Sequence, residues 1–218
     1  MTWDNAFAWS ILPELLRGLW VTVQVTLLGT AIAMVVGLLI AVVRFSRIPV
    51  VSKLFGFLVE LLRGTPLLVQ AYIAFFVLPA YGIRFSAMVT GVLVIGLNYS
   101  AYTAEVYRAG IADVPVGQWE AATALSLPHS RTWVRVVLPQ ALRSVVPMLG
   151  NYLIQMFKDS AVLFAITVYE LMGHAQAVGS SSYRYLEPLT LTGLLFLLVS
   201  YPASQLVRIL ERRLALSR

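Results

Sequence analysis

The sequence predicts an all-α integral membrane protein with about five transmembrane helices. Hydrophobic residues make up 59% of its 218 residues and charged residues only 12%, about half the charged fraction of ordinary soluble domains. The mean hydropathy is +0.82. Several stretches reach the ~20 apolar residues that a helix needs to cross a bilayer core of ~30 Å. Basic residues lie between these stretches instead of forming one run, which argues against nucleic acid as a partner.

Five apolar stretches follow one another in what we predict to be a single domain, residues 1–218. The first (18–43) and the third (85–104) contain no charged residue. The second (54–78) contains Glu60 and Arg63, and the fourth (139–164) carries its charges near its ends. The fifth (188–207) is followed by a basic cluster. Each stretch is long enough for one span.

The distribution of basic residues predicts the orientation of these spans. An odd number of spans places the termini on opposite sides. With the N-terminus outside, one face of the membrane collects eleven basic residues and the other four. The first set is Arg44, Arg47, Lys53, Arg108, Arg131, Arg135, Arg143, Arg208, Arg212, Arg213 and Arg218, and the second is Arg17, Arg84, Lys158 and Arg184. Cytoplasmic loops carry the excess of lysine and arginine, so we expect a cytoplasmic C-terminus.

The N-terminal stretch has two interpretations. Residues 6–20 place Trp9, Leu12, Leu16 and Leu19 near one helical face, which is typical of a short interfacial helix. The alternative is a simple extension of the first span. Because the chain start lacks a basic segment and the first apolar stretch exceeds a signal-peptide core, we expect the stretch to be retained.

The segment 109–140, between the third and fourth spans, is polar and organised. Asp113 is a candidate helix cap, with Pro115 in the first turn. Good helix formers fill residues 116–125, and Pro128 ends the element because proline disfavours helical geometry in the residue before it. A second helix is expected to begin near Ser130 and lead into the fourth span. The segment therefore predicts a short helix lying crosswise on the cytoplasmic surface.

Within this segment, Glu120-Ala121-Ala122 followed by Leu138-Pro139 resembles the EAA loop of ABC importer permeases. The resemblance implies the transmembrane domain of a type I ABC importer, in which this loop is a coupling helix that docks on a cytoplasmic ATPase. Members usually carry glycine where this chain has Ser126. A left-handed turn would cost serine roughly 1 kcal/mol, so we expect the turn to differ somewhat. The coupling residues implied are Gly117, Trp119, Glu120, Ala121, Ala122 and Ser126.

Other motifs resemble the polar amino acid permeases within that family. They are Arg63-Gly64-Thr65-Pro66-Leu67, the segment 101–110, Gly117-Gln118-Trp119 and Lys158-Asp159-Ser160-Ala161. The chain opening Met1-Thr2-Trp3-Asp4, the segment 168–173 and Tyr185-Leu186-Glu187-Pro188 look most like ectoine/hydroxyectoine permease subunits. The resemblance implies import of an ectoine-type compatible solute, with a glutamine-, histidine- or arginine-type amino acid as the alternative.

The same resemblance implies a bacterial plasma membrane location and several partners. These are a dimer of cytoplasmic ABC ATPases, a second permease subunit (identical or related), an extracytoplasmic solute-binding protein and membrane lipid. The polar outer segment 170–187 is the predicted landing surface for the binding protein, or else a plain connecting loop. The sequence has no phosphate-cradling GxxxxGK[ST] loop, so ATP and Mg²⁺ are assigned to the ATPase and no cofactor to this chain.

Charged and polar residues within the spans are candidates for the translocation path or for contacts between helices. Arg63 lies three residues after Glu60, so it could pair with Glu60, pair with Glu105 across helices, or meet the solute. Lys158 and Asp159 point about 100° apart on a helix, so one can face the path while the other is paired. Asn98 and Tyr102 belong to a polar belt whose role, lining or helix packing, is open.

Two other functional classes are weaker. A membrane-embedded enzyme would need a cluster of catalytic side chains or metal ligands, and neither His129 nor His174 has a companion at ligand spacing. A stand-alone ion-coupled transporter would show inverted repeats with broken helices in matching halves, which the sequence does not display. For Glu120, the alternative to coupling is a solvated glutamate on a helix surface.

Overall fold

A computed structural model describes residues 2–45 and 48–215 of the protein. Outside these residues lie Arg47 and Arg218 of the basic set above, and Met1 of the opening motif. The described chain contains helices and no strands. The α-helices are α1 (Asn5–Arg44), α2 (Pro49–Gly64), α3 (Leu67–Tyr72), α4 (Ala87–Ala112), α5 (Val116–Ala124), α6 (His129–Arg131), α7 (Leu138–Asp159), α8 (Leu171–Ser182) and α9 (Leu186–Ala215).

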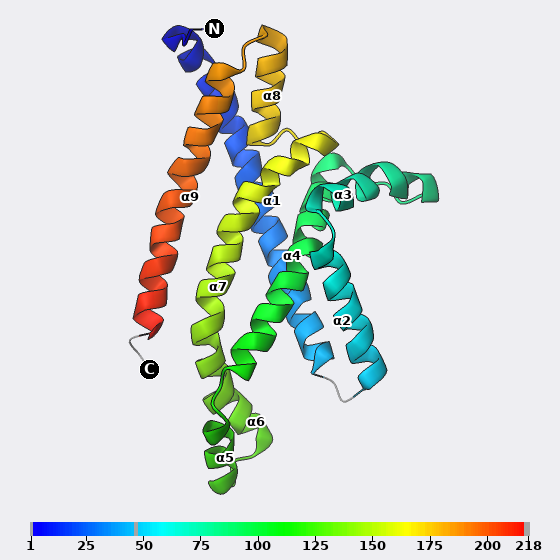
Figure 1. The fold of residues 1–218 in the computed structure, drawn as a ribbon, viewed down its shortest axis with the longest axis vertical. Coiled ribbons are helices and arrows are strands. Elements are labelled where there is room, and N and C mark those ends of the chain that lie inside the picture. The colour runs from blue at the N-terminus through cyan, green and yellow to red at the C-terminus, as the bar shows by residue number, and fades with distance from the viewer. Residues whose placement is uncertain (1, 46–47, 216–218) are drawn as a thin grey trace.

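Four non-α segments continue or join these helices. Two are π-helical, η1 (Ile73–Val77) and η3 (Thr132–Val137), and two are 3₁₀-helical, η2 (Leu78–Tyr81) and η4 (Ser160–Ile166). Figure 1 shows the start of the chain and α8 at one end of an elongated bundle, and α5 and α6 at the opposite end. The predicted coupling element and the outer segment are therefore separated by the length of the bundle.

The five predicted spans correspond to three unbroken helices and two bent pairs. Helices α1, α4 and α9 are each long and apolar enough to cross a membrane unbroken. The second span is α2 followed by Leu67–Tyr81, bent by 103°, and the fourth belongs to a pair bent by 45° between His129–Ile166 and α8. With each pair counted as one span, the described chain offers up to five.

Residues 6–20 continue the first span, so the separate interfacial helix was the wrong alternative. They belong to α1, which is 40 residues long and begins after Asp4, whose side chain accepts hydrogen bonds from two backbone N–H groups. Ile11 and Leu15 are buried against Leu171 and Ala175 of α8. This packing gives the stretch a protein partner on one face, and that contact keeps it in line with the rest of α1.

The second span is not one straight helix, because the chain breaks at Thr65 and Pro66. Thr65 is extended (φ −111°, ψ 140°), as expected for a residue that precedes proline. The segment from α3 to η2 then projects sideways from the bundle (Figure 1). Hydropathy alone had predicted one continuous span over residues 54–78.

The outer segment 170–187 contains a helix and is not a plain loop. The buried carboxylate of Glu170 caps α8 by accepting hydrogen bonds from the backbone N–H groups of Met172 (2.9 Å) and Gly173 (2.8 Å). Thr22 of α1 accepts a further bond from the N–H of Leu171 at 3.1 Å. Helix α8 is thereby attached to the outer half of α1.

Helices α1 and α4 form the centre of the bundle and approach each other closely. A Cβ atom built on Gly37 would lie 2.0 Å from the Thr103 hydroxyl oxygen and 2.9 Å from the Ser100 carbonyl oxygen. The Thr103 hydroxyl donates a hydrogen bond to the carbonyl oxygen of Ala33 at 2.7 Å. Small residues and interhelical hydrogen bonds of this kind hold helices together in lipid, where apolar burial drives association weakly.

Candidate functional site

The predicted coupling helix is α5, although its N-terminus differs from the prediction. Pro115, and not Asp113, occupies the N-cap position, and no side chain caps the helix. Asp113 instead follows the last turn of α4, where its backbone N–H donates to the Ala109 carbonyl oxygen at 2.9 Å. The capping prediction was wrong because α4 extends beyond the predicted third span and includes the residues just before Asp113.

The turn after α5 keeps its left-handed conformation with serine in place of glycine. Ser126 has φ +53°. Its N–H donates to the Thr123 carbonyl oxygen at 2.9 Å, and the N–H of Leu127 donates to the Ala122 carbonyl oxygen at 3.0 Å. This pair of bonds is the Schellman motif, which satisfies carbonyl groups left open at a helix end. The expected change in the turn is therefore absent, and serine accepts the strain.

The coupling element packs on itself through an apolar cluster. Val114, Val137 and Ala141 are buried in it, with the rings of Trp119 and Trp133 edge to face at a centroid distance of 5.3 Å. Trp119 thus faces the inside of the element, and Ala122 is buried as well. Glu120, Gly117 and Ala121 are exposed.

The exposed apolar surface of this element comes from residues outside the predicted coupling set. Val116, Leu125 and Val134 are 70%, 73% and 64% exposed. They lie on three successive parts of the element, α5, its C-cap and η3. The only feature of the sequence that could have indicated them is that each is a large apolar residue within a polar segment. An apolar surface beside an exposed glutamate is suited to docking on another protein.

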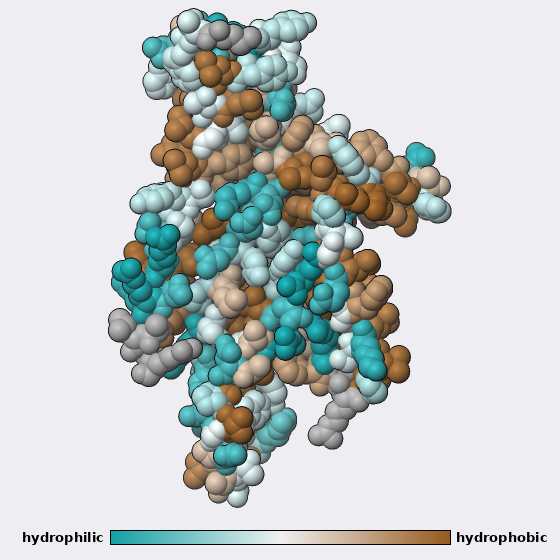
Figure 2. All heavy atoms as spheres, viewed as in Figure 1, coloured by the Kyte–Doolittle hydropathy of each residue, from teal (hydrophilic) through white to brown (hydrophobic). Residues whose placement is uncertain are grey.

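A second cluster of candidate residues lies within the spans, on α2, α4 and α7. Arg63 places its guanidinium over the ring of Tyr102, 5.4 Å from the centroid. Tyr102 also contacts Tyr99 and Tyr152, with centroid distances of 5.5 and 5.7 Å. We call Tyr99, Tyr102 and Tyr152 the tyrosine trio. Figure 2 shows hydrophilic residues across the middle of the face on which α4 and α7 lie.

Asp159 and Lys158 separate as their spacing predicted. The Asp159 carboxylate accepts hydrogen bonds from the Tyr99 hydroxyl and from the Gln155 amide, the latter at 3.0 Å. Lys158 is exposed and makes no ion pair within the part of the chain that the structure describes. No motif in the sequence indicated Tyr152 or Gln155, although Gln155 lies one helical turn before Asp159.

Asn98 stabilises the break in the second span. Its buried side-chain amide donates to the carbonyl oxygen of Leu62 at 3.0 Å and to the side-chain oxygen of Gln70 at 3.2 Å. Gln70 in turn donates to the Thr65 hydroxyl at 2.7 Å and to the Leu62 carbonyl at 2.8 Å. These bonds satisfy backbone groups that the end of α2 leaves open. Asn98 therefore has a helix-packing role.

Glu105 binds arginines other than the one that was expected. Its carboxylate forms ion pairs with Arg44 at the end of α1 and with Arg108 one turn further along α4. Arg63 makes no ion pair with Glu60 or Glu105 among the residues described. Glu105 thus joins α1 to α4 near the coupling end and is separate from the tyrosine trio.

Comparison with known proteins identifies the family. The model of the "binding-protein-dependent transport system inner membrane component" family matches residues 33–216. The chain belongs to this family. A probable amino-acid ABC transporter permease protein of Sinorhizobium fredii is 46% identical over 215 residues, covering 96% of this chain and 93% of that protein. The L-cystine transport system permease protein TcyB of Bacillus subtilis is 32% identical, covering 98% and 94%.

Two solved structures have the same fold as this chain. A chain from the crystal structure of an amino acid ABC transporter with histidines superposes with a TM-score of 0.93 at 35% identity, covering 98% of this chain and all of that one. A chain of the inward-facing MetNI methionine ABC transporter, at 20% identity, gives a TM-score of 0.73. The predicted fold of a type I ABC importer permease is confirmed, and the protein is a permease subunit of a binding-protein-dependent importer.

Proposed function

We propose that this permease forms, with a second permease subunit and two copies of a cytoplasmic ATPase, an importer for a polar amino acid. The observation that carries the proposal of a zwitterionic solute is the polar wall within the spans, made of Arg63, the tyrosine trio and Asp159. Charged side chains at membrane depth are costly toward lipid and usually face a partner or water. One chain of up to five spans is too small to enclose a path, so a second subunit is expected to complete it.

The chemistry of the wall suits a zwitterion. Asp159 offers a carboxylate whose hydrogen bonds to Tyr99 and Gln155 hold it in place. The tyrosine rings offer faces to a cation, as Tyr102 does to Arg63. Arg63 offers a positive group to a carboxylate. An α-amino acid carries both of the complementary charges.

The names of the relatives support an amino acid over a compatible solute. The two relatives described above are named for amino-acid and L-cystine transport. Ectoine remains a prediction from motif resemblance, and ectoine is also zwitterionic, so the wall does not separate the two. We therefore place the amino acid first and test both in one assay.

The coupling element supports the proposed energy source. Glu120 and the apolar residues Val116, Leu125 and Val134 are exposed at the end of the bundle that carries the predicted cytoplasmic basic residues. The proposal places the ATPase there, with the solute-binding protein at the opposite end, over α8. ATP-driven closure of the ATPase pair would push α5. The push would reach the wall through α6 and η3, because these segments continue without interruption into α7, which carries Asp159.

Uptake into proteoliposomes tests the proposal. The permease is reconstituted with the second permease subunit, the ATPase and the solute-binding protein of its complex, and ATP-dependent uptake of labelled arginine, histidine, glutamine, cystine and ectoine is measured. We expect uptake of at least one amino acid that requires all components. ATP-dependent uptake of ectoine alone would reject the amino acid proposal, and uptake without the ATPase would reject the importer class.

Variants of the wall test its role. Asp159→Asn and Arg63→Gln should each lower kcat/KM by about tenfold or more, because each removes one charge that the zwitterion would meet. Arg84→Gln is the matched control for Arg63→Gln, since Arg84 is an exposed outer arginine. Equal uptake by Arg63→Gln, Asp159→Asn and the control would exclude the wall from the path.

A further inference from the structure

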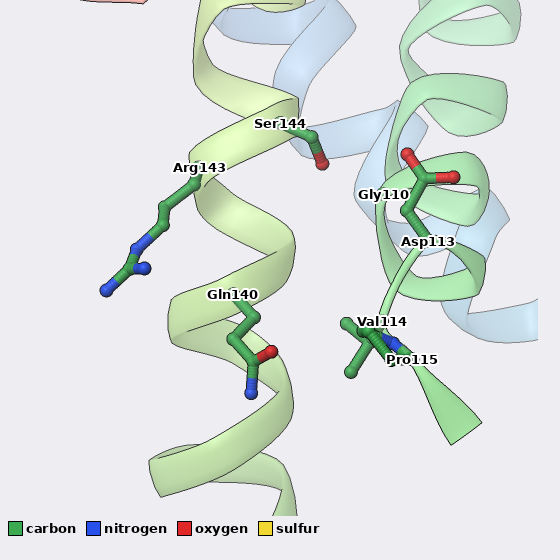
Figure 3. A pocket seen from close by; sticks show the side chains of 7 residues that line it. All are labelled: Gly110, Asp113, Val114, Pro115, Gln140, Arg143 and Ser144. Carbon is green, nitrogen blue, oxygen red and sulfur yellow. The ribbon is translucent and has the colours of Figure 1, made fainter. Parts of the chain in front are cut away.

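A cavity of about 380 Å³ lies beside the coupling element, between the end of α4 and the beginning of α7. Asp113, Gln140 and Ser144 supply polar side chains to it, and Arg143 also belongs to its lining. In Figure 3 the Asp113 carboxylate and the Ser144 hydroxyl lie on opposite sides of the space between the two helices, and Gln140 lies below them on α7. None of these three residues belongs to the tyrosine trio or to the wall around it.

All three side chains present hydrogen-bond acceptors to the cavity. The Gln140 amide nitrogen is used, because it donates to the Val136 carbonyl oxygen at 2.9 Å and to the Gln118 side-chain oxygen at 3.2 Å. The Ser144 hydroxyl proton is used as well, in a bond to the Ala141 carbonyl oxygen at 3.0 Å. The amide oxygen of Gln140 and a lone pair of Ser144 remain available.

Asp113 gives the cavity a negative charge. Its carboxylate takes part in no hydrogen bond or ion pair across residues 2–45 and 48–215. It also follows the C-terminus of α4, where the helix dipole is negative. A carboxylate, two neutral acceptors and a helix C-terminus together favour a cationic donor, which is a lysine ammonium or an arginine guanidinium.

The geometry distinguishes between a protein side chain and a free amino acid as the source of that cation. A free amino acid would also bring a carboxylate, which needs its own cationic partner. Arg143 borders the cavity, but Figure 3 shows its side chain directed away from Asp113, on the other side of α7. A basic side chain of a protein brings only the positive group, and this cavity accommodates that better.

The cavity is continuous with the surface that would meet the ATPase. Pro115, two residues after Asp113, is the N-cap of α5, and Gln118 of α5 is the residue that binds Gln140. Resting on the proposed function, we propose that this cavity receives a lysine or arginine side chain of the cytoplasmic ATPase. The contact fixes the register of α5 on the ATPase, because apolar docking alone specifies position weakly whereas a charge pair specifies it well.

Substitution of Asp113 in the complete complex tests this inference. Asp113→Asn keeps the size of the side chain and removes its charge, and Asp113→Glu restores the charge. Glu211→Gln is the matched control, because Glu211 is an exposed carboxylate on α9, within the C-terminal basic cluster that is predicted to be cytoplasmic. The dissociation constant between the permease pair in nanodiscs and the purified ATPase is measured at 50 and 300 mM salt.

We expect Asp113→Asn to weaken association about threefold to tenfold at 50 mM salt and to reduce its salt dependence. Asp113→Glu should recover part of the loss, and the Glu211 control should bind like the wild type. If Asp113→Asn binds the ATPase as tightly as the wild type at both salt concentrations, this inference is wrong while the proposed function stands. Failure of the wild-type permease to bind the ATPase would instead reject the proposed function, and this inference with it.

A second measurement tests whether the cavity binds a free amino acid instead of an ATPase side chain. Arginine or lysine is added at 10 mM to the ATPase side of the proteoliposomes while solute uptake is followed. We expect any inhibition of uptake by the added amino acid to be the same for the wild type and for Asp113→Asn. Inhibition that Asp113→Asn abolishes, with ATPase binding unchanged, would show that the cavity binds a free cationic amino acid and that the docking inference is wrong.

Discussion

Replacement of Gly37 by alanine tests the central α1–α4 contact. The new Cβ atom would lie 2.0 Å from the Thr103 hydroxyl oxygen and 2.9 Å from the Ser100 carbonyl oxygen, both on α4. A carbon and an oxygen that are not bonded need about 3.3 Å or more. The hydroxyl must therefore rotate away or the two helices must separate, and in either case the 2.7 Å bond from Thr103 to the Ala33 carbonyl is lost.

The cost follows from these two effects. Overpacking of a tight contact typically costs about 1–3 kcal/mol, and loss of one buried hydrogen bond adds about 1 kcal/mol. We therefore expect Gly37→Ala to lower the free energy of unfolding by about 2–4 kcal/mol. For a chain of this length, that corresponds to a midpoint roughly 5–15 °C lower.

Gly193→Ala provides the matched control. Gly193 is an exposed position in α9, and no atom lies within 4 Å of the Cβ built there. Alanine in an open helical position stabilises by about 0.5–1 kcal/mol relative to glycine, so this variant should be at least as stable as the wild type. Thermal unfolding of the purified permease in one detergent compares the three proteins. Equal midpoints for Gly37→Ala and Gly193→Ala would refute the close-contact argument.

Three further predictions concern the bend, the turn and the coupling residue. Asn98→Leu leaves the Leu62 carbonyl with one donor fewer and should destabilise the permease by about 1–3 kcal/mol, as measured by thermal unfolding; an unchanged midpoint would show that Asn98 does not stabilise the bend. Ser126→Gly should change the free energy of unfolding by less than about 0.5 kcal/mol, because relief of the left-handed strain offsets the larger entropy of the unfolded chain. Ser126→Val should destabilise the permease by about 1 kcal/mol or more, and equal stability of the two variants would show that the left-handed backbone at this position is not strained. Glu120→Lys, at an exposed position, should alter stability by less than about 0.5 kcal/mol yet reduce ATP-dependent uptake at least tenfold; normal uptake by a normally assembled complex would exclude Glu120 from coupling.

The sequence contained enough to predict the class of fold and the position of the coupling element. Apolar length and the placement of basic residues are local quantities, and the need to satisfy backbone groups in lipid leaves helices as the solution for such segments. Pro128 marked the end of α5 through the restriction that proline imposes on the residue before it, and the same restriction acts in the structure at Pro66. The corresponding extended residue is seen at Thr65.

Long-range partners could not be predicted in this way. Glu105 pairs with Arg44 and Arg108, and Arg63 stacks on Tyr102, although the sequence had suggested that Arg63 and Glu105 could pair. Each residue along a helix turns the side chain by about 100°, so a partner on another helix depends on the rotation and depth of both helices. Hydropathy carries no information about either quantity.

What the sequence by itself determined is a bundle of apolar helices with a polar docking element, because solvent and backbone geometry act on each segment separately. What only the tertiary structure decided is which polar groups meet. The close α1–α4 approach, the tyrosine trio and the acceptor-lined cavity around Asp113 each combine residues from helices that are far apart in the chain. Their positions follow from packing between helices, which depends on all of the contacts at once.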